Sequence, residues 1–394
     1  MKKRDYDAVV IGAGPAGSVA AYEMAQIGFS VLLIEKDKKP GQPLCCAEAV
    51  ARPSFEKLID PRPEWISAYI NKARLIAPNN EDITVYQPEA GLILDRQRLD
   101  FDLAQRAVET GAELICSCIG LRLLGNGKEF DEIEVEEKST GRIKIKAKIF
   151  ISAEGVEARV ARLAGIDNHE VFDDVESLLQ YRVSGIRIDP NTVEIYVGEE
   201  VAPKGYLWVF PKSETSANVG LGVALEGVRG PVCESKLDNF IKKRFGQYHI
   251  DFKSCGLVPK YQGSGILIKD NLLVVGDSGR VLDSFSGAGI VNAIMSGQDA
   301  GRASIEYLSA NIAVGEIKKF YPGQFLAAKE HELIMYRKLR KIYTKLRDAD
   351  FNDIVEALKG QFPEGRTEGV NVIKLLTQII RTRPQLLRLV RYLI

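Results

Sequence analysis

Residues 6–36 read YDAVVIGAGPAGSVAAYEMAQIGFSVLLIEK, and this stretch decides the fold of the amino-terminal part of the chain. The apolar run from Ala8 to Ile11 is typical of a buried strand, and GAGPAG follows it directly. A helical stretch then leads to a second apolar strand that ends at Glu35. A strand, a glycine-rich turn, a helix and another strand predict a βαβ unit with parallel strands.

The glycines of this turn suit a bound dinucleotide. Gly12 permits the tight turn, Gly14 lets the backbone approach a pyrophosphate, and Gly17 allows the helix to pack closely on the strand. Glu35 is placed to meet the adenosine ribose hydroxyls. The flanking strand, helix and acid make the pattern much more specific than a bare GxGxxG, but they do not separate NAD from FAD.

Residues 271–300, NLLVVGDSGRVLDSFSGAGIVNAIMSGQDA, form a second strand, turn and helix. The strand ends in Gly276 and Asp277, and a turn with Gly287 and Gly289 leads into the helix. Asp277 suits a ribityl hydroxyl, and the positive end of the helix dipole suits the pyrimidine edge of a reduced flavin. An ordinary core segment would explain the apolar run but not the carboxylate and the two glycines together.

Composition excludes several classes of protein. The 394 residues suggest two or three domains, and 53 basic against 53 acidic residues leave no electrostatic footprint for nucleic acid. Six cysteines are too few for a disulfide scaffold and favour a reducing compartment, and three scattered histidines with a lone CxC argue against a metal site. No signal-peptide segment or run of transmembrane length is visible, so we expect a cytoplasmic protein.

Between about residues 167 and 265 the sequence alternates as strands, and one of these carries an aromatic row. In YLWVFPK, residues 206–212, Tyr206, Trp208 and Phe210 project from one face because strand side chains repeat every second residue. Alternation alone favours a row that packs in the core. The alternative is that the row forms an apolar floor for a bound ligand with a long hydrocarbon chain. Lys212 at the strand end suits either a phosphate contact or plain solvation.

Together these segments resemble the p-hydroxybenzoate hydroxylase-like, glutathione-reductase-type flavoproteins, and among them the geranylgeranyl reductases. YLWVFPK matches the YxWxFPK motif of that family, and CCAEA, residues 45–49, matches an RCGEG-like segment at Cys46 and Glu48 only. Glu154-Gly155 stands for the family's DG pair, and residues 283–289 stand for its DPxxGGG turn. The resemblance runs from Asp7 to about Gly301.

The resemblance implies an α/β (α+β) fold in which a glutathione-reductase-type, Rossmann-like FAD domain carries an inserted antiparallel-sheet substrate domain and a helical carboxy-terminal region. We expect the FAD domain to be discontinuous, with residues 1–78, 92–166 and 266–313. The substrate domain would take residues 79–91 and 167–265, and the helical region residues 314–394. In relatives an arginine at the start of the helix after residue 95 lies against the flavin, so Arg98 or Arg96 is a further candidate, with a solvated helix face the alternative for each.

The implied activity is FAD-dependent saturation of carbon–carbon double bonds in geranylgeranyl chains, on isoprenoid ether lipids or related prenyl compounds. The expected cofactor-binding residues are Gly12, Gly14, Ala16, Gly17, Glu35, Cys46, Arg98, Gly276, Asp277, Gly287, Gly289 and Ile290. The expected substrate-binding residues are Tyr206, Trp208, Phe210 and Lys212, and no metal ligand is expected. A polyprenyl lipid is the expected substrate, and the electron donor is either NAD(P)H or a ferredoxin-like protein.

Cys46 is the expected catalytic residue. Adjacent Cα atoms lie about 3.8 Å apart, which is too close for an unstrained disulfide, so Cys45 and Cys46 are expected to be free thiols. A buried free cysteine is ordinarily a small hydrophobe. In relatives, however, this loop approaches the flavin ring where substrate reacts, and a thiol there can donate a proton or sense redox state. Cys45 is either its partner or a filling residue.

Other readings share parts of this pattern. Reduction of menaquinone or chlorophyll prenyl chains uses the same chemistry, and a flavin monooxygenase or halogenase shares the fold. The WxWxIP strand of halogenases differs from residues 206–211 in its first Trp and its Ile. A nonenzymatic flavin-bound sensor or lipid carrier would keep both cofactor segments without needing Cys46.

The carboxy-terminal stretch from Asn371 to Ile394 combines an apolar helix face with lysine and arginine, and no acid appears after Glu368. Such a basic amphipathic segment is typical of peripheral membrane contact. A helix that packs on its own domain is an equally good reading of the same pattern.

Overall fold

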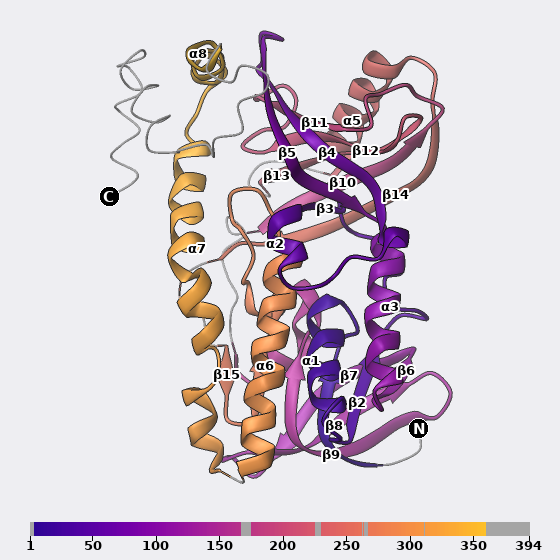
Figure 1. The fold of residues 1–394 in the computed structure, drawn as a ribbon, viewed down its shortest axis with the longest axis vertical. Helices are drawn as coiled ribbons and strands as arrows, with labels where there is room; N and C mark the ends of the chain where they lie inside the picture. The colour runs from indigo at the N-terminus through magenta and orange to yellow at the C-terminus, as the bar shows by residue number, and fades with distance from the viewer. Residues whose placement is uncertain are drawn as a thin grey trace. The chain divides into compact units, whose positions relative to one another are not determined.

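The computed structural model describes residues 4–166, 175–224, 230–261, 263, 267–310 and 312–359. It divides the chain into two compact units, each assembled from three separate segments that the colours of Figure 1 trace. The first unit consists of Met1–Leu44, Arg96–Val171 and Pro259–Met335, and the second of Cys45–Asp95, Phe172–Val258 and Tyr336–Ile394.

The first unit is a sheet with helices. Its elements are β1 (Asp5–Ile11), α1 (Pro15–Ala25), β2 (Val31–Glu35), α3 (Arg96–Glu109), β6 (Glu113–Cys116), β7 (Cys118–Gly125), β8 (Phe130–Glu137), β9 (Gly141–Ser152), η2 (Gly155–Glu157), α4 (Arg159–Leu163), β15 (Ile268–Lys269), β16 (Leu272–Val274), η4 (Gly276–Gly279), α6 (Ile290–Ala310), η5 (Val314–Lys319) and the first part of α7 (Gly323–Tyr343). The strand order is β15-β16-β9-β1-β2-β6, and β8 joins β9 to β7. β1 lies parallel to both β2 and β9, as the βαβ pattern predicts.

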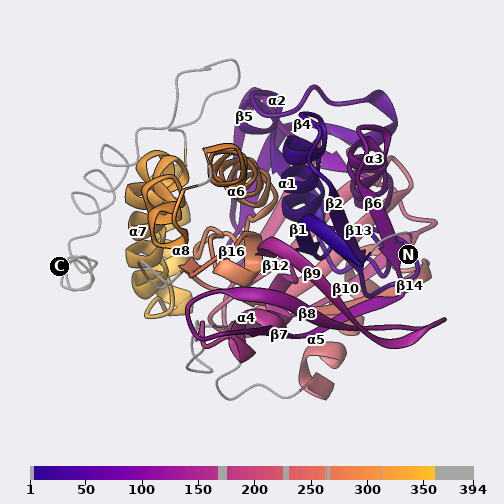
Figure 2. The same cartoon turned by 90° about the horizontal axis from the view of Figure 1, so that it is seen from below.

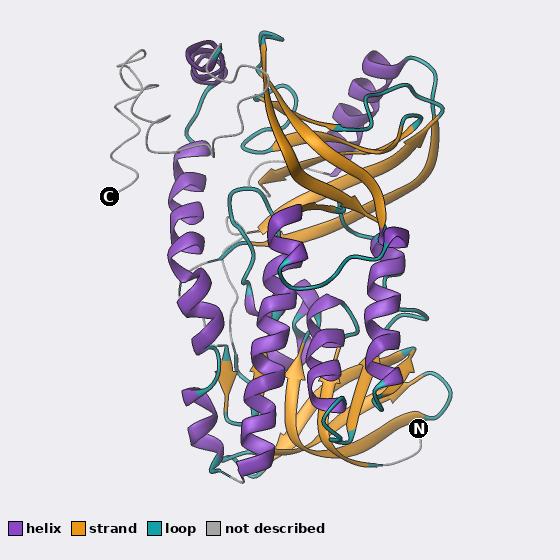
Figure 3. Ribbon diagram, viewed as in Figure 1, coloured by secondary structure: helices purple, strands orange, loops and turns teal. Residues whose placement is uncertain are grey.

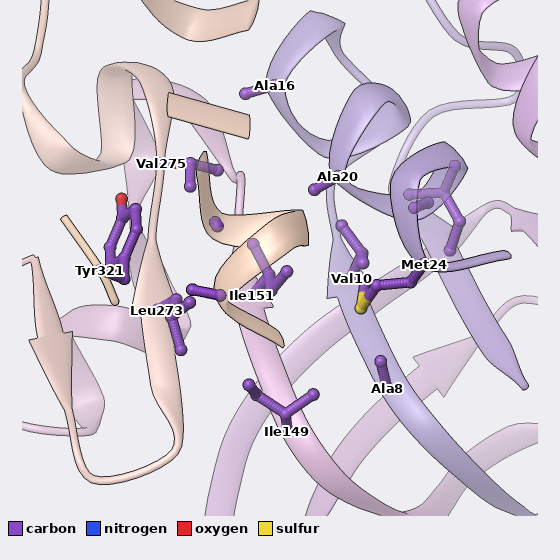
Figure 4. Close-up of a cluster of buried hydrophobic side chains, with 14 of the residues drawn as sticks. Ala8, Val10, Ala16, Ala20, Met24, Ile149, Ile151, Leu273, Val275 and Tyr321 are labelled. Atoms are coloured by element: carbon purple, nitrogen blue, oxygen red, sulfur yellow. The ribbon is translucent and has the colours of Figure 1, made fainter. Parts of the chain in front are cut away.

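Period-two alternation in β1 builds two cores in this unit. Ala8 and Val10 point into a cluster that includes side chains of α1, as Figure 4 shows, whereas Val9 and Ile11 belong to a cluster on the other face. Helices α1 and α6 lie side by side in Figures 1 and 2. They approach closely because Gly297 has no side chain: a Cβ there would lie 2.3 Å from the carbonyl oxygen of Ala16.

The second unit is built on a second mixed sheet, which also has eight strands. Its elements are β3 (Ala49–Ala51), α2 (Arg52–Glu56), η1 (Pro63–Trp65), β4 (Ile66–Ile76), β5 (Asp82–Leu94), β10 (Val175–Ser184), β11 (Thr192–Val197), β12 (Tyr206–Ser213), β13 (Ser216–Ala224), α5 (Gly230–Phe245), β14 (His249–Pro259) and α8 (Asp348–Leu358). The strand order is β14-β10-β13-β12-β11-β4-β5-β3. Within it β10, β13, β12 and β11 pair antiparallel in turn, but β11 and β4 pair parallel.

Helix α5 packs on one face of this sheet, and Figure 3 shows it as a purple helix among the orange strands. Leu237 and Ile241 of α5 share a buried cluster with Leu207 and Val209 of β12. The intervening residues of β12 therefore face the opposite side of the sheet, where Trp208 joins a separate cluster.

The predicted fold class is confirmed, because a Rossmann-like unit and a second, largely antiparallel sheet are both present. The structure draws the boundaries differently, however. β4, expected within the FAD-domain segment 1–78, pairs with β5 and β11 in the second sheet. Residues 314–394 do not form a separate unit, since the chain divides between Met335 and Tyr336. Hydrogen bonding across β4, rather than its position between the motifs, decides where it belongs.

The amphipathic stretch from Asn371 to Ile394 lies outside the described residues. Among the helices that the structure does describe, none is both long enough and apolar enough to cross a membrane.

Candidate active site

The first glycine turn is tightly packed at two positions and open at the third. A Cβ on Gly12, whose φ is +103°, would lie 2.3 Å from the carbonyl oxygen of Ala153, and a Cβ on Gly17 would lie 1.9 Å from that of Gly12. A Cβ on Gly14, in contrast, would meet no atom within 4 Å. Gly14 is also the amino-terminal cap of α1, and no side chain caps that helix end. Backbone amides and open space at a helix amino terminus are what a pyrophosphate requires.

Glu35 supports this turn from the end of β2. Its carboxylate accepts hydrogen bonds of 2.9 Å from the amides of Ala13 and Asp37. Burial raises the pKa of Glu35, and the two amide hydrogen bonds oppose that rise. The predicted ribose-binding acid is therefore held in place by the same turn that would bind the phosphates.

The second glycine segment meets the first at Ala16. A Cβ on Gly276, whose φ is +60°, would lie 3.2 Å from the Cβ of Ala16, so the two predicted cofactor segments are in contact within one unit. α6 begins at Ile290, and a Cβ on Gly289 would lie 3.2 Å from a carboxylate oxygen of Asp277. The segments thus bring together two helix amino termini and a carboxylate.

Burial raises the pKa of Asp277, and the charge of Arg96 opposes the rise. Arg96 is largely buried and donates two hydrogen bonds of 2.7 Å to Asp100. Arg98 is exposed on α3. Of the two predicted arginines, Arg96 is therefore the one whose charge acts on Asp277. The open space at Gly14, the amino terminus of α1 without a side-chain cap and the Asp277 carboxylate together fit FAD.

In the second unit, a carboxylate from the cysteine loop is buried among basic side chains. Glu48 is 1% exposed, and one of its carboxylate oxygens accepts hydrogen bonds from Arg182 at 2.6 Å, Lys212 at 2.8 Å and Asn218 at 2.8 Å. The φ of Glu48 is +71°, a left-handed conformation that costs a non-glycine residue free energy and persists only where the surroundings impose it. We refer to these four residues as the Glu48 cluster.

Lys212 was expected either to contact a phosphate or to be solvated, and its side chain is too buried for plain solvation. Its ammonium group donates to Glu48 and, at 2.5 Å, to the carbonyl oxygen of Leu94. Burial lowers the pKa of Lys212, and the Glu48 charge opposes the fall. Lys212 is thus an internal cation of the Glu48 cluster.

Cys46 is half-buried on a loop that is held at successive residues. Its Sγ accepts a 3.2 Å hydrogen bond from the amide of Glu48, and its carbonyl oxygen accepts one of 3.0 Å from the side chain of Gln180. Asn218 donates to the carbonyl oxygen of Ala47 at 3.1 Å. We refer to residues 45–48 as the thiol loop. Cys45, at its start, is exposed.

The aromatic row lies on the face of β12 that is opposite α5. The ring centroids of Tyr206 and Trp208 are 5.9 Å apart, and those of Trp208 and Phe210 are 6.2 Å apart. Trp208 and Phe210 are buried, whereas Tyr206 is partly exposed. The indole of Trp208 donates a 3.1 Å hydrogen bond to Gln180. The row is thus a well-packed apolar surface whose accessible member is Tyr206.

Sequence reasoning missed Gln180, Arg182 and Asn218. The first two lie two residues apart in β10, on the face opposite Tyr181 and Val183, which pack under α5. Two polar side chains at a spacing of two, alternating with Leu179, Tyr181 and Val183, were the available signal, because such residues are rarely buried without a partner. In the described part of the chain, no group of three or more His, Cys, Asp or Glu side chains is arranged to hold a metal ion.

Comparison with known proteins gives two family matches. Residues 7–204 match the FAD dependent oxidoreductase family, and residues 174–256 match the geranylgeranyl reductase catalytic domain. The digeranylgeranylglycerophospholipid reductase of Methanocella arvoryzae is 34% identical over 98% of both chains.

Solved structures agree. The crystal structure of a geranylgeranyl bacteriochlorophyll reductase-like protein from Thermoplasma acidophilum superposes with a TM-score of 0.91 at 27% identity, covering 99% of this chain and all of that one. A flavin-dependent brominase matches over 98% of this chain and 99% of its own, with a TM-score of 0.71 and 18% identity. The latter likeness is one of fold alone.

Proposed function

Because the chain belongs to the geranylgeranyl reductase family of FAD-dependent oxidoreductases, we propose that it saturates double bonds in the geranylgeranyl chains of an isoprenoid ether lipid. The relatives named digeranylgeranylglycerophospholipid reductases support that class of substrate. The observation that carries the proposal is the thiol loop, which is bonded through Gln180 to the aromatic row within one unit.

The residues that would hold FAD are those of the two glycine segments. The amides around Gly14 bind the pyrophosphate, Glu35 the adenosine ribose and Asp277 a ribityl hydroxyl. When bound and reduced, FAD supplies the hydride.

The thiol of Cys46 supplies the proton. An isolated trisubstituted alkene accepts hydride poorly, so the less substituted carbon is protonated and positive charge develops on the tertiary carbon. The S–H bond breaks, a C–H bond forms, and the thiolate is reprotonated from solvent. Addition of hydride to the tertiary carbon completes a net gain of two hydrogens for each double bond. General-acid groups of this kind typically contribute about 10²- to 10⁴-fold.

The aromatic row binds the hydrocarbon and stabilises the developing charge. A prenyl chain offers no hydrogen bonds, so it is held by apolar area, to which the ring faces of Tyr206, Trp208 and Phe210 contribute. Aromatic faces also attract a nearby cation. The Glu48 cluster contacts the thiol loop rather than the alkene, so its role is to fix where the thiol lies.

A second candidate substrate is the geranylgeranyl group of a chlorophyll or bacteriochlorophyll, which the likeness to the geranylgeranyl bacteriochlorophyll reductase-like protein of Thermoplasma acidophilum favours. Incubating the FAD-loaded protein and dithionite with each prenyl compound, followed by mass spectrometry, separates the candidates. Pairs of added hydrogens on the ether lipid support the proposal, and the same gain on only the chlorophyll compound supports the alternative. Added oxygen or halogen on either compound contradicts both.

Peripheral attachment to anionic membranes is the further part of this proposal. It rests on the sequence from Asn371 to Ile394, where lysines and arginines accompany an apolar helical pattern. Each basic residue near an anionic surface contributes about 1 kcal/mol, so several together hold the protein at low salt.

A further inference from the structure

We propose that Gln180 is a positioning residue that fixes the Cys46 thiol relative to the aromatic row, an inference that rests on the proposed function of both. Gln180 lies in β10 and is 3% exposed. Its side chain is the link between the two groups: Oε1 accepts from the Trp208 indole at 3.1 Å, and Nε2 donates to the carbonyl oxygen of Cys46 at 3.0 Å.

The two partners fix the orientation of the Gln180 amide. An indole N–H can only donate and a carbonyl oxygen can only accept, so the amide oxygen must face Trp208 and the amide nitrogen must face Cys46. Reversing the amide would break both hydrogen bonds. Since the site is buried, water cannot replace either one without cost. The side chain is therefore a spacer with one stable arrangement.

A glycine makes this contact possible. β13 lies between β10 and β12, and Gly220 of β13 is the register partner of both Gln180 and Trp208. Neighbouring strands are about 4.8 Å apart, so the indole must cross about 10 Å of sheet to reach β10. It passes directly over Gly220, where a Cβ would lie 2.4 Å from the ring. The backbone of three strands thus sets the position of the indole N–H.

The carbonyl of Cys46 is the point at which this arrangement acts on the thiol. It belongs to the peptide that joins Cys46 to Ala47, while the amide of Glu48 binds Sγ. Losing the Gln180 hydrogen bond frees that peptide to rotate, which moves the sulfur relative to the ring faces. The Glu48 cluster still holds the end of the loop, so the protein keeps its fold while the thiol loses its fixed position.

The test uses the full-length, FAD-loaded protein in a Cys45→Ala background. Gln180→Met removes both hydrogen bonds at similar length, Gln180→Glu keeps an acceptor for Trp208 but loses the donor to Cys46, and Gln87→Met, on exposed β5 surface, is the matched control. Alkylation of Cys46 by iodoacetamide is followed by peptide mass spectrometry without lipid. Both Gln180 variants lose the buried hydrogen bond to the Cys46 carbonyl, so each should change the alkylation rate about tenfold, and the control should not.

Turnover of geranylgeranyl lipid gives the second readout. For both Gln180 variants kcat should fall about tenfold or more with KM little changed, because a misplaced proton donor weakens the transition state and not substrate binding. Alkylation rates and kcat equal to wild type overturn the inference, as does an equal effect in Gln87→Met.

Failure of the proposed function is distinguishable: wild type would then reduce no lipid, yet the alkylation rates would still shift. If Gln180→Met loses FAD, Trp208→Phe, which keeps an aromatic ring in the row but lacks the indole N–H, must change Cys46 alkylation, and an unchanged rate there also overturns the inference.

Discussion

Replacing Glu48 by glutamine should destabilise the second unit strongly, because two buried cations lose their counter-charge. Arg182 and Lys212 both bind the same oxygen of Glu48, and their side chains are 19% and 9% exposed. Removing one partner of a buried ion pair typically costs about 3–5 kcal/mol.

Proton loss sets a ceiling on the part of this cost that comes from Lys212. Lys212 can lose its proton instead of remaining charged and unpaired. From its ordinary value of 10.5, deprotonation at pH 7 costs about 5 kcal/mol at about 1.4 kcal/mol per unit. Burial already lowers the pKa of Lys212, so the ceiling is lower still, and we expect a loss of about 3–4 kcal/mol.

The assay is equilibrium urea unfolding followed by tryptophan fluorescence. The two tryptophans of the chain, Trp65 and Trp208, both lie in the second unit, so their emission reports on that unit. The matched variant is Glu48→Gln/Lys212→Met, which removes one of the uncompensated cations. The loss of unfolding free energy in this double variant should be about 1–2 kcal/mol smaller than the sum of the losses in the two single variants, because neighbouring residues couple.

The pH dependence follows from the lowered pKa of Lys212. When the folded-state pKa of a lysine lies below its unfolded value, the unfolded chain binds more protons between the two values, so stability rises with pH there. The difference in unfolding free energy between wild type and Glu48→Gln should therefore shrink as the pH rises from 7 toward 10. A loss below about 1 kcal/mol, the size typical of an exposed pair, or additivity in the double variant would refute the reasoning.

Four further outcomes are expected. Cys46→Ala should retain FAD but slow alkene reduction about 10²-fold or more, whereas Cys45→Ala should not, and equal turnover of the two would return both thiols to a packing role. Gly14→Val should abolish FAD uptake, read from flavin absorbance, because its side chain fills the open space at the α1 terminus. Asp277→Asn should stabilise the cofactor-free protein at pH 7 but not at pH 4. The folded-state pKa of Asp277 is raised, so the stability that this carboxyl contributes is fully present below its unfolded-state pKa and is lost as the pH rises through its folded-state pKa. An equal gain in thermal stability at both pH values contradicts this. Truncation before Asn371 should reduce co-sedimentation with anionic vesicles at low salt while flavin stays bound, and loss of flavin would instead place that segment in the core.

The first unit was largely predictable because its signals are contiguous. GAGPAG, the strands beside it and the acid at Glu35 lie within about thirty residues, and the helices over Arg96–Glu109 and Gly323–Tyr343 follow the helical period. The hairpin of β8 and β9 turns at residues 138–140, where Ser139 and Thr140 stand before Gly141, a local signal typical of a turn. Local backbone preference decides such elements, so the sequence reveals them directly.

The Glu48 cluster could not be predicted in this way. Its members come from a loop and three strands, and as many as 170 positions separate the donor and acceptor of one hydrogen bond. A lysine at a strand end gives no local sign that it is buried against a carboxylate, which is why the sequence did not indicate the contact of Lys212 with Glu48. Likewise, nothing near Ile66–Ile76 shows that this strand pairs with β11, since that contact bridges more than a hundred residues.

The pattern YLWVFPK now has a physical reading at each position. Tyr206, Trp208 and Phe210 lie on the face opposite α5, and Lys212 neutralises Glu48. Trp208 makes two kinds of contact: its ring packs in the aromatic row, and its indole N–H donates a hydrogen bond to Gln180. A phenylalanine there keeps only the first. The sheet register shifts between Pro211 and Ser213, and a proline, which lacks an N–H, is tolerated at such an irregularity.

The two variable positions of the motif, Leu207 and Val209, face the other side of the sheet. Leu207 and Val209 are fully or almost fully buried in the cluster beneath α5, where any apolar side chain of similar volume serves. Their neighbours on the other face must supply a specific ring, indole N–H or ammonium group, which few residue types can provide. The alternation of fixed and free positions in the YxWxF part of the motif is therefore the two-residue period of one strand, with general packing on one face and, in our proposal, the positioning of Cys46 on the other.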